Sequence, residues 1–185
     1  SEAILISDPA LGKPDSQAIA QVLAAAIRKI ISTDPVDMVV FGRQAIDTDM
    51  GLTAPQTSRL LGWPALTLVS KISSIDPQAG TIQVERMIEE GRQIVEARLP
   101  VVISVVKDIG EPRYPSFMGI RKASRANIPT WTLADLGIAA PESKVSWPEV
   151  MNPPVRETIC EIITGETPQE IAEKLAEKIL AEKVL

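Results

Sequence analysis

The chain of 185 residues contains no histidine and a single cysteine, Cys160. Without histidine it cannot build a Ser-His-Asp triad, a histidine general base or an imidazole metal site. A single cysteine excludes an internal disulfide, a zinc ribbon and a cysteine-ligated cluster, so we interpret Cys160 as a small apolar packing residue. These absences favour a binding or cofactor-scaffolding role over self-contained enzymatic chemistry.

Aromatic residues make up only 3% of the chain, and no apolar run reaches the length of a membrane-spanning helix. The formal net charge of -5 argues against nucleic acid as the main partner. Residues 1–7 show neither the basic region nor the cleavage pattern of a secretory signal. We therefore expect a protein that is not embedded in a membrane and does not bind nucleic acid.

The hydrophobic pattern of the first third predicts a βαβ unit. Residues 3–7 predict a short buried strand, and Pro14 opens a helix whose apolar residues recur every three or four positions until Asp34. A second buried strand follows over residues 37–41. Two strands joined in this way are expected to pair in parallel through a right-handed crossover.

A polar segment follows the second strand directly and leads into a helix that ends near Leu61. This segment reads Gly42, Arg43, Gln44, Ala45, Ile46, Asp47, Thr48, Asp49, Met50, Gly51, Leu52, Thr53. Ligands of open α/β sheets collect beyond the carboxyl ends of the strands, where a helix N-terminus offers free N–H groups to a phosphate. We interpret Thr53 as the N-cap of the helix, with Gln56 completing a capping box. Alone, the pattern leaves nucleotide binding and an ordinary surface turn both open.

The middle of the chain has a different pattern. Residues 66–72, 80–88 and 93–98 form short, partly alternating runs that predict antiparallel hairpins. The apolar run over residues 101–106 predicts a strand covered on both faces. Together with the βαβ unit, these runs predict an α/β, Rossmann-like fold whose mostly parallel sheet carries an antiparallel hairpin addition.

The last part of the chain predicts an extended arm that ends in a helix. Residues 139–155 are rich in proline and have no helical or strand period. Thr167, Pro168 and Glu170 then carry the N-cap, first-residue and capping-box signals of an amphipathic helix. We therefore divide the chain into a nucleotide-binding α/β domain, residues 1–138, and a C-terminal arm, residues 139–185.

Three segments together resemble the β subunit of electron transfer flavoproteins. They are the Gly-Arg-Gln-Ala-Ile-Asp motif at 42–47, the acidic-glycine hairpin at 84–94 and the Glu-Pro-Arg-Tyr motif at 111–114. Their order and spacing also match, and the resemblance extends from residue 3 to about residue 136. It implies a heterodimer in which the α subunit holds most of the FAD and the β subunit binds AMP structurally.

The resemblance also implies the partners of the chain. Family members carry electrons from acyl-CoA and related dehydrogenases toward a membrane quinone oxidoreductase. We therefore expect an electron-carrier subunit and not an enzyme, located in the cytoplasm or, in a eukaryote, in the mitochondrial matrix. The arm, residues 139–185, is expected to dock on the α subunit.

By the same resemblance, residues 42–53 bind the AMP. Asp47 and Asp49 are expected to accept hydrogen bonds from ribose or adenine, and the backbone of residues 51–53 to face phosphate. A second segment is expected to dock the dehydrogenase, through Tyr114, Pro115, Ser116, Phe117 and Lys122. Phe117 stands where the family has an anchoring leucine, with packing in the core as the alternative.

Two departures from the family pattern bear on the ligand. Family members begin with a strand, a loop and a helix before the position of Ser1, so the resemblance implies that the family's N-terminal segment is absent here. Thr53 resembles the AMP-binding members, whereas Pro55 resembles electron-bifurcating members that hold a second FAD in place of AMP. Both ligands stay open, as does a stand-alone adenine-nucleotide-binding module.

Overall fold

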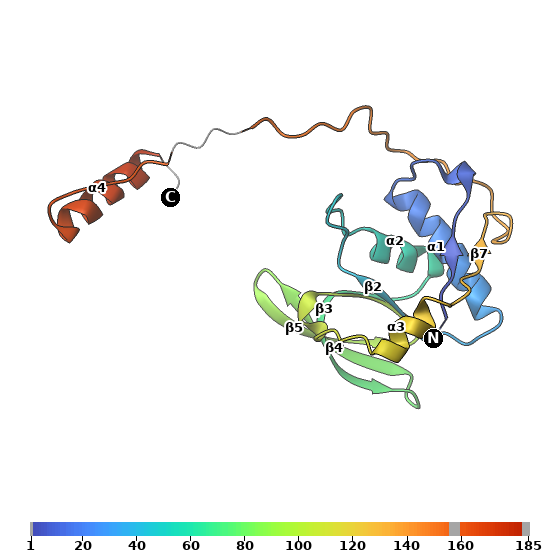
Figure 1. Ribbon diagram of the computed structural model, residues 1–185. Coiled ribbons are helices and arrows are strands. Elements are labelled where there is room, and N and C mark those ends of the chain that lie inside the picture. Colours follow the sequence, from blue (N-terminus) through green and yellow to red (C-terminus); the bar gives the residue numbers. More distant parts are fainter. Residues whose placement is uncertain (1, 156–159, 183–185) are drawn as a thin grey trace. The chain divides into compact units, whose positions relative to one another are not determined.

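A computed structural model describes residues 2–155 and 160–182 of the chain. The chain divides into two compact units, Ser1–Ser146 and Trp147–Leu185. Unit 1 contains a central sheet with helices, and unit 2 contains the helix α4, Pro168–Ala181 (Figure 1). Within the described residues, no helix combines the length and the hydropathy needed to cross a membrane.

A five-stranded sheet with the order β2-β6-β3-β4-β5 forms the centre of unit 1. Its strands are β2 Met38–Gly42, β3 Ala65–Asp76, β4 Thr81–Ile88, β5 Gly91–Arg98 and β6 Val101–Val105. β2 and the first part of β3 run parallel to β6, which lies between them. β4 pairs antiparallel with β3, and β5 pairs antiparallel with β4. The predicted mostly parallel sheet with an antiparallel hairpin addition is confirmed.

The strand β6 is the most buried element of the sheet. Its first four residues are all buried, as expected for a strand covered on both faces. The main hydrophobic cluster joins β6 to the long strands β3 and β4 and consists of Leu66, Val69, Ile82, Val84, Val101 and Ile103. Burial of these branched side chains is the main favourable term that holds the parallel and antiparallel parts of the sheet together.

Two helices pack beside this sheet. α1, Ser16–Ile31, contacts α2, Thr53–Leu61, and α2 also contacts β3 and β6 (Figure 1). α1 buries several alanines, whose small side chains permit a close approach of neighbouring backbone. α2 ends at Gly62, which adopts the left-handed conformation (φ 75°) that helix C-termini favour. A third, short helix, α3, covers Phe117–Ala123.

The first strand differs from the prediction in its length, burial and pairing. β1 covers only Leu5–Ile6 and pairs in parallel with β7, Thr130–Trp131, in a separate two-stranded sheet. The side chain of Leu5 is 53% exposed, so the expectation of a buried strand over residues 3–7 is wrong. The expected pairing of this strand with β2 is also wrong, because the backbone of residues 129–131 accepts the N–H groups of Leu5 and Ser7 instead.

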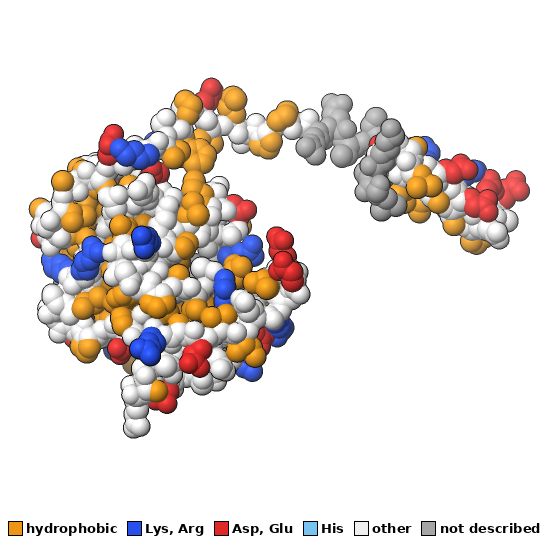
Figure 2. All heavy atoms as spheres, turned by 180° about the vertical axis from the view of Figure 1, so that it is seen from behind, with side chains coloured by type: hydrophobic (Ala, Val, Ile, Leu, Met, Phe, Trp, Pro, Cys, Tyr) orange, Lys and Arg blue, Asp and Glu red, His pale blue; other side chains and the backbone are white. Residues whose placement is uncertain are grey.

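Figure 2 shows hydrophobic side chains exposed in a band across unit 1.

The start of α2 also differs from the prediction. Leu52 is the N-cap and has no side-chain cap, while Thr53 is the first helical residue. The proposed capping box is wrong because Leu52 already has helical backbone angles (φ -90°, ψ -19°), which places Thr53 one position too far into the helix. The N–H of Gln56 donates to the carbonyl of Leu52 at 3.0 Å.

In unit 2 the predicted start of α4 is confirmed. The hydroxyl of Thr167 accepts the N–H of Glu170 at 3.2 Å, and Pro168 is the first helical residue. The carboxylate of Glu170 accepts the N–H of Glu166 at 2.9 Å, one residue further back than in a capping box. Residues 139–155 contain no helix or strand, as predicted, whereas residues 156–159 and 183–185 of the arm lie outside the described part.

Cys160 also lies in unit 2, and its side chain is exposed. The interpretation of Cys160 as a packing residue is therefore wrong for the described structure. The physical reason is that the residues from 160 to the start of α4 form neither helix nor strand and bury little side-chain surface.

Candidate functional site

The two predicted site segments leave the sheet at neighbouring parallel strands. β2 ends at Gly42, which pairs in register with Val105, the last residue of β6. From β2 the nucleotide segment, residues 42–53, leads to α2, and from β6 the chain leads through a 3₁₀ helix to the docking segment, residues 113–122. Because parallel strands end at the same edge, the nucleotide segment and the chain that leads to the docking segment both leave the sheet where open α/β sheets bind ligands.

Hydrogen bonds within the nucleotide segment give it a defined shape. The side-chain amide of Gln44 donates to Oδ1 of Asp49 and accepts from Nε of Arg43 at 3.1 Å. The N–H of Asp49 donates to the carbonyl of Ala45 at 3.0 Å. Asp49 and Gly51 both adopt left-handed backbone angles (φ 51° and 62°). A side chain at position 51 would be strained there and would start 3.6 Å from Oε1 of Gln44, which accounts for the glycine.

The two aspartates of this segment keep hydrogen-bonding capacity. Oδ1 of Asp47 accepts the N–H of Thr48 at 2.9 Å, and Oδ1 of Asp49 accepts from Gln44. Neither Oδ2 atom accepts a hydrogen bond from any described residue. Since a carboxylate oxygen accepts a hydroxyl proton strongly, the exposed aspartates suit a ribose hydroxyl.

Backbone donors at the start of α2 are also free. The N–H groups of Gly51, Leu52, Thr53 and Ala54 have no acceptor among residues 2–155 and 160–182. Pro55 has no N–H, and it lies in the first helical turn, where an N–H would have no intrahelical partner. Free N–H groups together with the helix dipole attract an anion, so this helix start suits a phosphate.

Two polar atoms of α2 lie buried without a partner among the described residues. They are Oε1 of Gln56 and Oγ1 of Thr57, and Thr57 is fully buried. A buried polar atom without a partner lowers stability, so a donor that reached Oε1 of Gln56 would relieve this cost. Neither atom was predicted as part of the site, because the sequence carries no signal for an unmet hydrogen bond.

The docking segment is a loop only as far as Ser116. α3 starts at Phe117, and the hydroxyl of Ser116 caps it by accepting the N–H of Gly119 at 3.1 Å. The side chains of Tyr114 and Phe117 are 99% and 88% exposed, so the ring of Phe117 does not pack in the core of this chain.

Basic side chains surround a shallow hollow of about 490 Å³ on α3. Met118, Gly119, Arg121, Lys122 and Arg125 line it. Between residues 112 and 127 the sequence has four basic residues and no acidic one, and no ion pair among the described residues involves these cations. Sequence reasoning named Lys122 but missed Arg121 and Arg125 as parts of one surface. Their helical spacing of three and four residues was the available signal.

Comparison with known proteins gives consistent matches. The electron transfer flavoprotein domain model matches residues 1–136. The electron transfer flavoprotein subunit beta of Megasphaera elsdenii is 33% identical, over 100% of this chain and 70% of the relative. The caffeyl-CoA reductase-Etf complex subunit CarD of Acetobacterium woodii is 35% identical with the same coverage. Protein FixA of Azotobacter vinelandii is 36% identical, over 74% of this chain and 49% of the relative.

Proposed function

The chain belongs to the electron transfer flavoprotein family, and on that premise we propose that it is the β subunit of a heterodimeric electron carrier. An α subunit holds most of the FAD, residues 42–53 bind AMP, and the docking segment contacts an electron-donating dehydrogenase. The observation that carries this proposal is that the parallel strands β2 and β6, from which the chain enters the two segments, end at the same edge of the sheet. The nucleotide segment begins where β2 ends, and the chain that leads to the docking segment leaves the neighbouring parallel strand β6, in a chain that matches the family.

The residues of the nucleotide segment fit AMP. The free N–H groups of residues 51–54 suit its phosphate, and the unpaired carboxylate oxygens of Asp47 and Asp49 suit its ribose. FAD supplies the redox chemistry of the complex when bound. The chain itself binds, orients and docks, in keeping with its lack of histidine and its single exposed cysteine. It therefore acts as a carrier subunit and not as an enzyme.

A second candidate function is the β subunit of an electron-bifurcating flavoprotein, with a second FAD in place of AMP. Pro55 favours it, because this proline resembles the bifurcating members and occupies the first turn of α2. The free N–H groups before Pro55 suit the diphosphate of FAD as well as the phosphate of AMP.

The proposed electron path runs from an acyl-CoA or related dehydrogenase through the heterodimer to a membrane quinone oxidoreductase. Exposed Tyr114 and Phe117 support docking, because large aromatic side chains dominate the binding energy of protein interfaces. Lys122 lies on α3, the helix that Phe117 starts, and lines the hollow on that helix. The proposed location is the cytoplasm, or the mitochondrial matrix if the source is eukaryotic.

Counting the bound cofactors tests these proposals. The chain is co-expressed with an electron transfer flavoprotein α subunit, and the purified heterodimer is analysed by visible absorption and nucleotide chromatography. One FAD and one AMP per heterodimer support the leading proposal, and two FAD support the second candidate. The isolated chain should carry no tightly bound flavin. A heterodimer without any flavin would contradict both candidates.

A further inference from the structure

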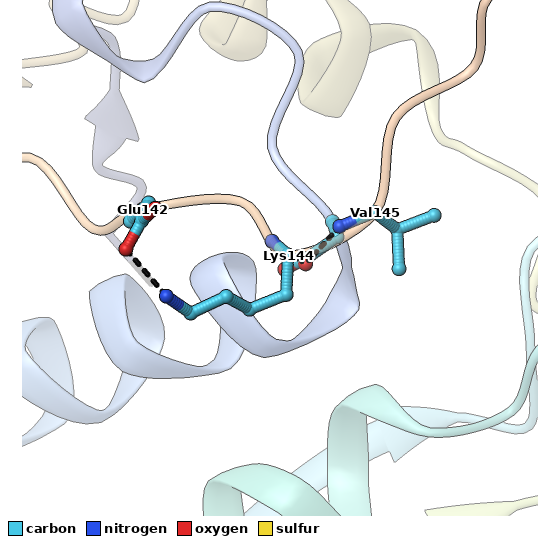
Figure 3. Close-up of polar contacts among 4 residues, drawn as sticks. Glu142, Lys144 and Val145 are labelled. Atoms are coloured by element: carbon cyan, nitrogen blue, oxygen red, sulfur yellow. Dashed lines mark hydrogen bonds and ion pairs between the residues drawn. The ribbon is translucent and has the colours of Figure 1, made fainter.

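A buried carboxylate connects the start of α1 to the residues that precede unit 2. Asp15 is only 7% exposed, and its Oδ1 accepts the N–H of Ala18 at 2.8 Å, which makes it the N-cap of α1. Its Oδ2 accepts the N–H groups of Lys144 at 2.7 Å and Val145 at 3.2 Å (Figure 3). The two oxygens therefore hold parts of the chain that lie 129 residues apart in sequence.

The contact depends on the carboxylate and on the backbone of residues 144 and 145. These residues belong to no helix or strand, so no regular ladder holds their N–H groups. The side chain of Lys144 forms an ion pair with Glu142, so its contact with Asp15 is through its backbone N–H (Figure 3). Hydrogen bonds from Ala18, Lys144 and Val145 lower the pKa of Asp15 below 3.8, so the stronger, charged acceptor is present at neutral pH.

This contact lies at the point where unit 1 ends. Unit 1 ends at Ser146, directly after Val145. α1 ends just before β2 begins, so its N-terminus lies toward the carboxyl end of β2. The start of the arm is therefore held at the same edge of the sheet that carries the nucleotide segment (Figure 1).

We propose that Asp15 is a positioning residue that fixes the arm root, residues 142–146, at this edge of unit 1. The arm then leaves unit 1 from a defined point on its way to the α subunit. This inference rests on the proposed docking of the arm on the α subunit. Holding one end of a binding segment in place lowers the conformational entropy that the segment loses on binding.

Replacement of Asp15 by serine separates its two roles. Serine is a good N-cap, so α1 keeps its start, but its single short hydroxyl leaves Lys144 and Val145 without an acceptor. In the full chain, trypsin should cleave the Lys144–Val145 bond about tenfold faster in Asp15→Ser, because local opening becomes more frequent. Amide hydrogen exchange of residues 142–148 should rise similarly, while exchange of α1 stays unchanged. Cleavage after Lys122 serves as the internal reference.

Asp8 offers a matched control. Its carboxylate also caps a short helix, through Ala10, and also holds a distant N–H, that of Leu133 at 3.0 Å. Asp8→Ser should leave cleavage after Lys144 at the wild-type rate. Equal cleavage and exchange in Asp15→Ser and wild type would overturn the inference. So would equal acceleration in Asp8→Ser, since that result would indicate general loosening of unit 1.

Subunit affinity separates this inference from the proposed function. Asp15→Ser should weaken binding to the α subunit about fivefold, and a chain that ends at Ser146 should lose most of it. An unchanged affinity after removal of residues 147–185 would contradict docking of the arm on the α subunit. The trypsin cleavage result would still test whether Asp15 holds the arm root. The positioning role alone would be overturned if the truncated chain lost its affinity for the α subunit but Asp15→Ser kept the wild-type affinity.

Discussion

At the scale of single residues, Asp47 tests the nucleotide segment. One of its carboxylate oxygens accepts no hydrogen bond within the described chain, so a ribose hydroxyl can take that place. If it does, Asp47→Ala removes a charge-assisted hydrogen bond and weakens AMP binding by about 1.5–3 kcal/mol. Titration calorimetry on the heterodimer measures the loss, and circular dichroism checks that the helix content is unchanged. Glu90→Ala, in the exposed turn between β4 and β5, is the control. Equal AMP affinity in both variants would make Asp47 an ordinary turn residue.

Phe117 provides a second residue-scale test. An exposed anchor should affect docking but not stability, whereas a core residue should affect stability but not docking. Its ring is 88% exposed, so Phe117→Ala should change the free energy of unfolding by less than about 0.5 kcal/mol. A buried phenylalanine would cost about 3–5 kcal/mol. If Phe117 anchors the dehydrogenase, enzymatic reduction of the heterodimer should slow more than about tenfold, while reduction by dithionite stays normal. A large fall in melting temperature with normal dehydrogenase kinetics would contradict the anchor.

At the scale of elements, α2 contains a buried hydroxyl, that of Thr57, with no hydrogen-bond partner in the described part of the chain. Thr57→Val keeps the shape of the side chain and removes the polar atom. The variant should be between neutral and about 1 kcal/mol more stable, because a buried unsatisfied group is destabilising. Urea unfolding of both proteins measures the difference. A loss of more than about 1 kcal/mol would mean that the hydroxyl has a partner in solution.

Acid sensitivity of the arm root is a second element-scale prediction. The pKa of Asp15 is lowered in the folded state, first by the N–H of Ala18 and then by that of Lys144. A group with a depressed folded pKa contributes stability above its unfolded pKa and loses it as the pH falls through the folded pKa. Its contribution should therefore be complete at neutral pH, begin to fall near the ordinary pKa of an aspartate and be lost as the pH falls through the lower folded pKa. The drop in melting temperature between pH 6 and pH 3 should be smaller in Asp15→Ser than in wild type.

Elements with local signals were predictable from the sequence. The Thr167-Pro168 start of α4 and the hairpin of β4 and β5 depend on neighbours within a few residues, so pattern and turn chemistry were sufficient. The pairing of β1 with β7 was not predictable, because it joins residues more than a hundred positions apart. The contact of Asp15 with Lys144 and the unmet hydrogen bonds of α2 also depend on tertiary packing. The resemblance to the family suggested the two site segments, and the structure adds that the chain enters them from neighbouring parallel strands, β2 and β6.

At the scale of the whole molecule, charge is unevenly distributed. The chain carries a net charge of -5, yet residues 112–127 contain four basic residues and no acidic one. Figure 2 shows Asp and Glu side chains gathered on α4 in unit 2. A basic surface favours partners with acidic surfaces through charge complementarity. If Phe117 anchors the dehydrogenase, we therefore expect that partner to present carboxylates around the ring.

Salt dependence tests this expectation. Arg121 and Arg125 line the hollow on α3, and neither forms an ion pair with another described residue. The double variant Arg121→Glu, Arg125→Glu should lower kcat/KM for heterodimer reduction by the dehydrogenase about tenfold at low salt, because steering by charge mainly changes the association rate. The difference should shrink as salt approaches 1 M, where the screening length falls to about 3 Å. Arg98→Glu, at the end of β5, changes the charge of a residue that does not line this hollow and should have little effect. A tenfold loss that persists at high salt would instead mean that the arginines act through local packing, and an equal loss in Arg98→Glu would point to net charge alone.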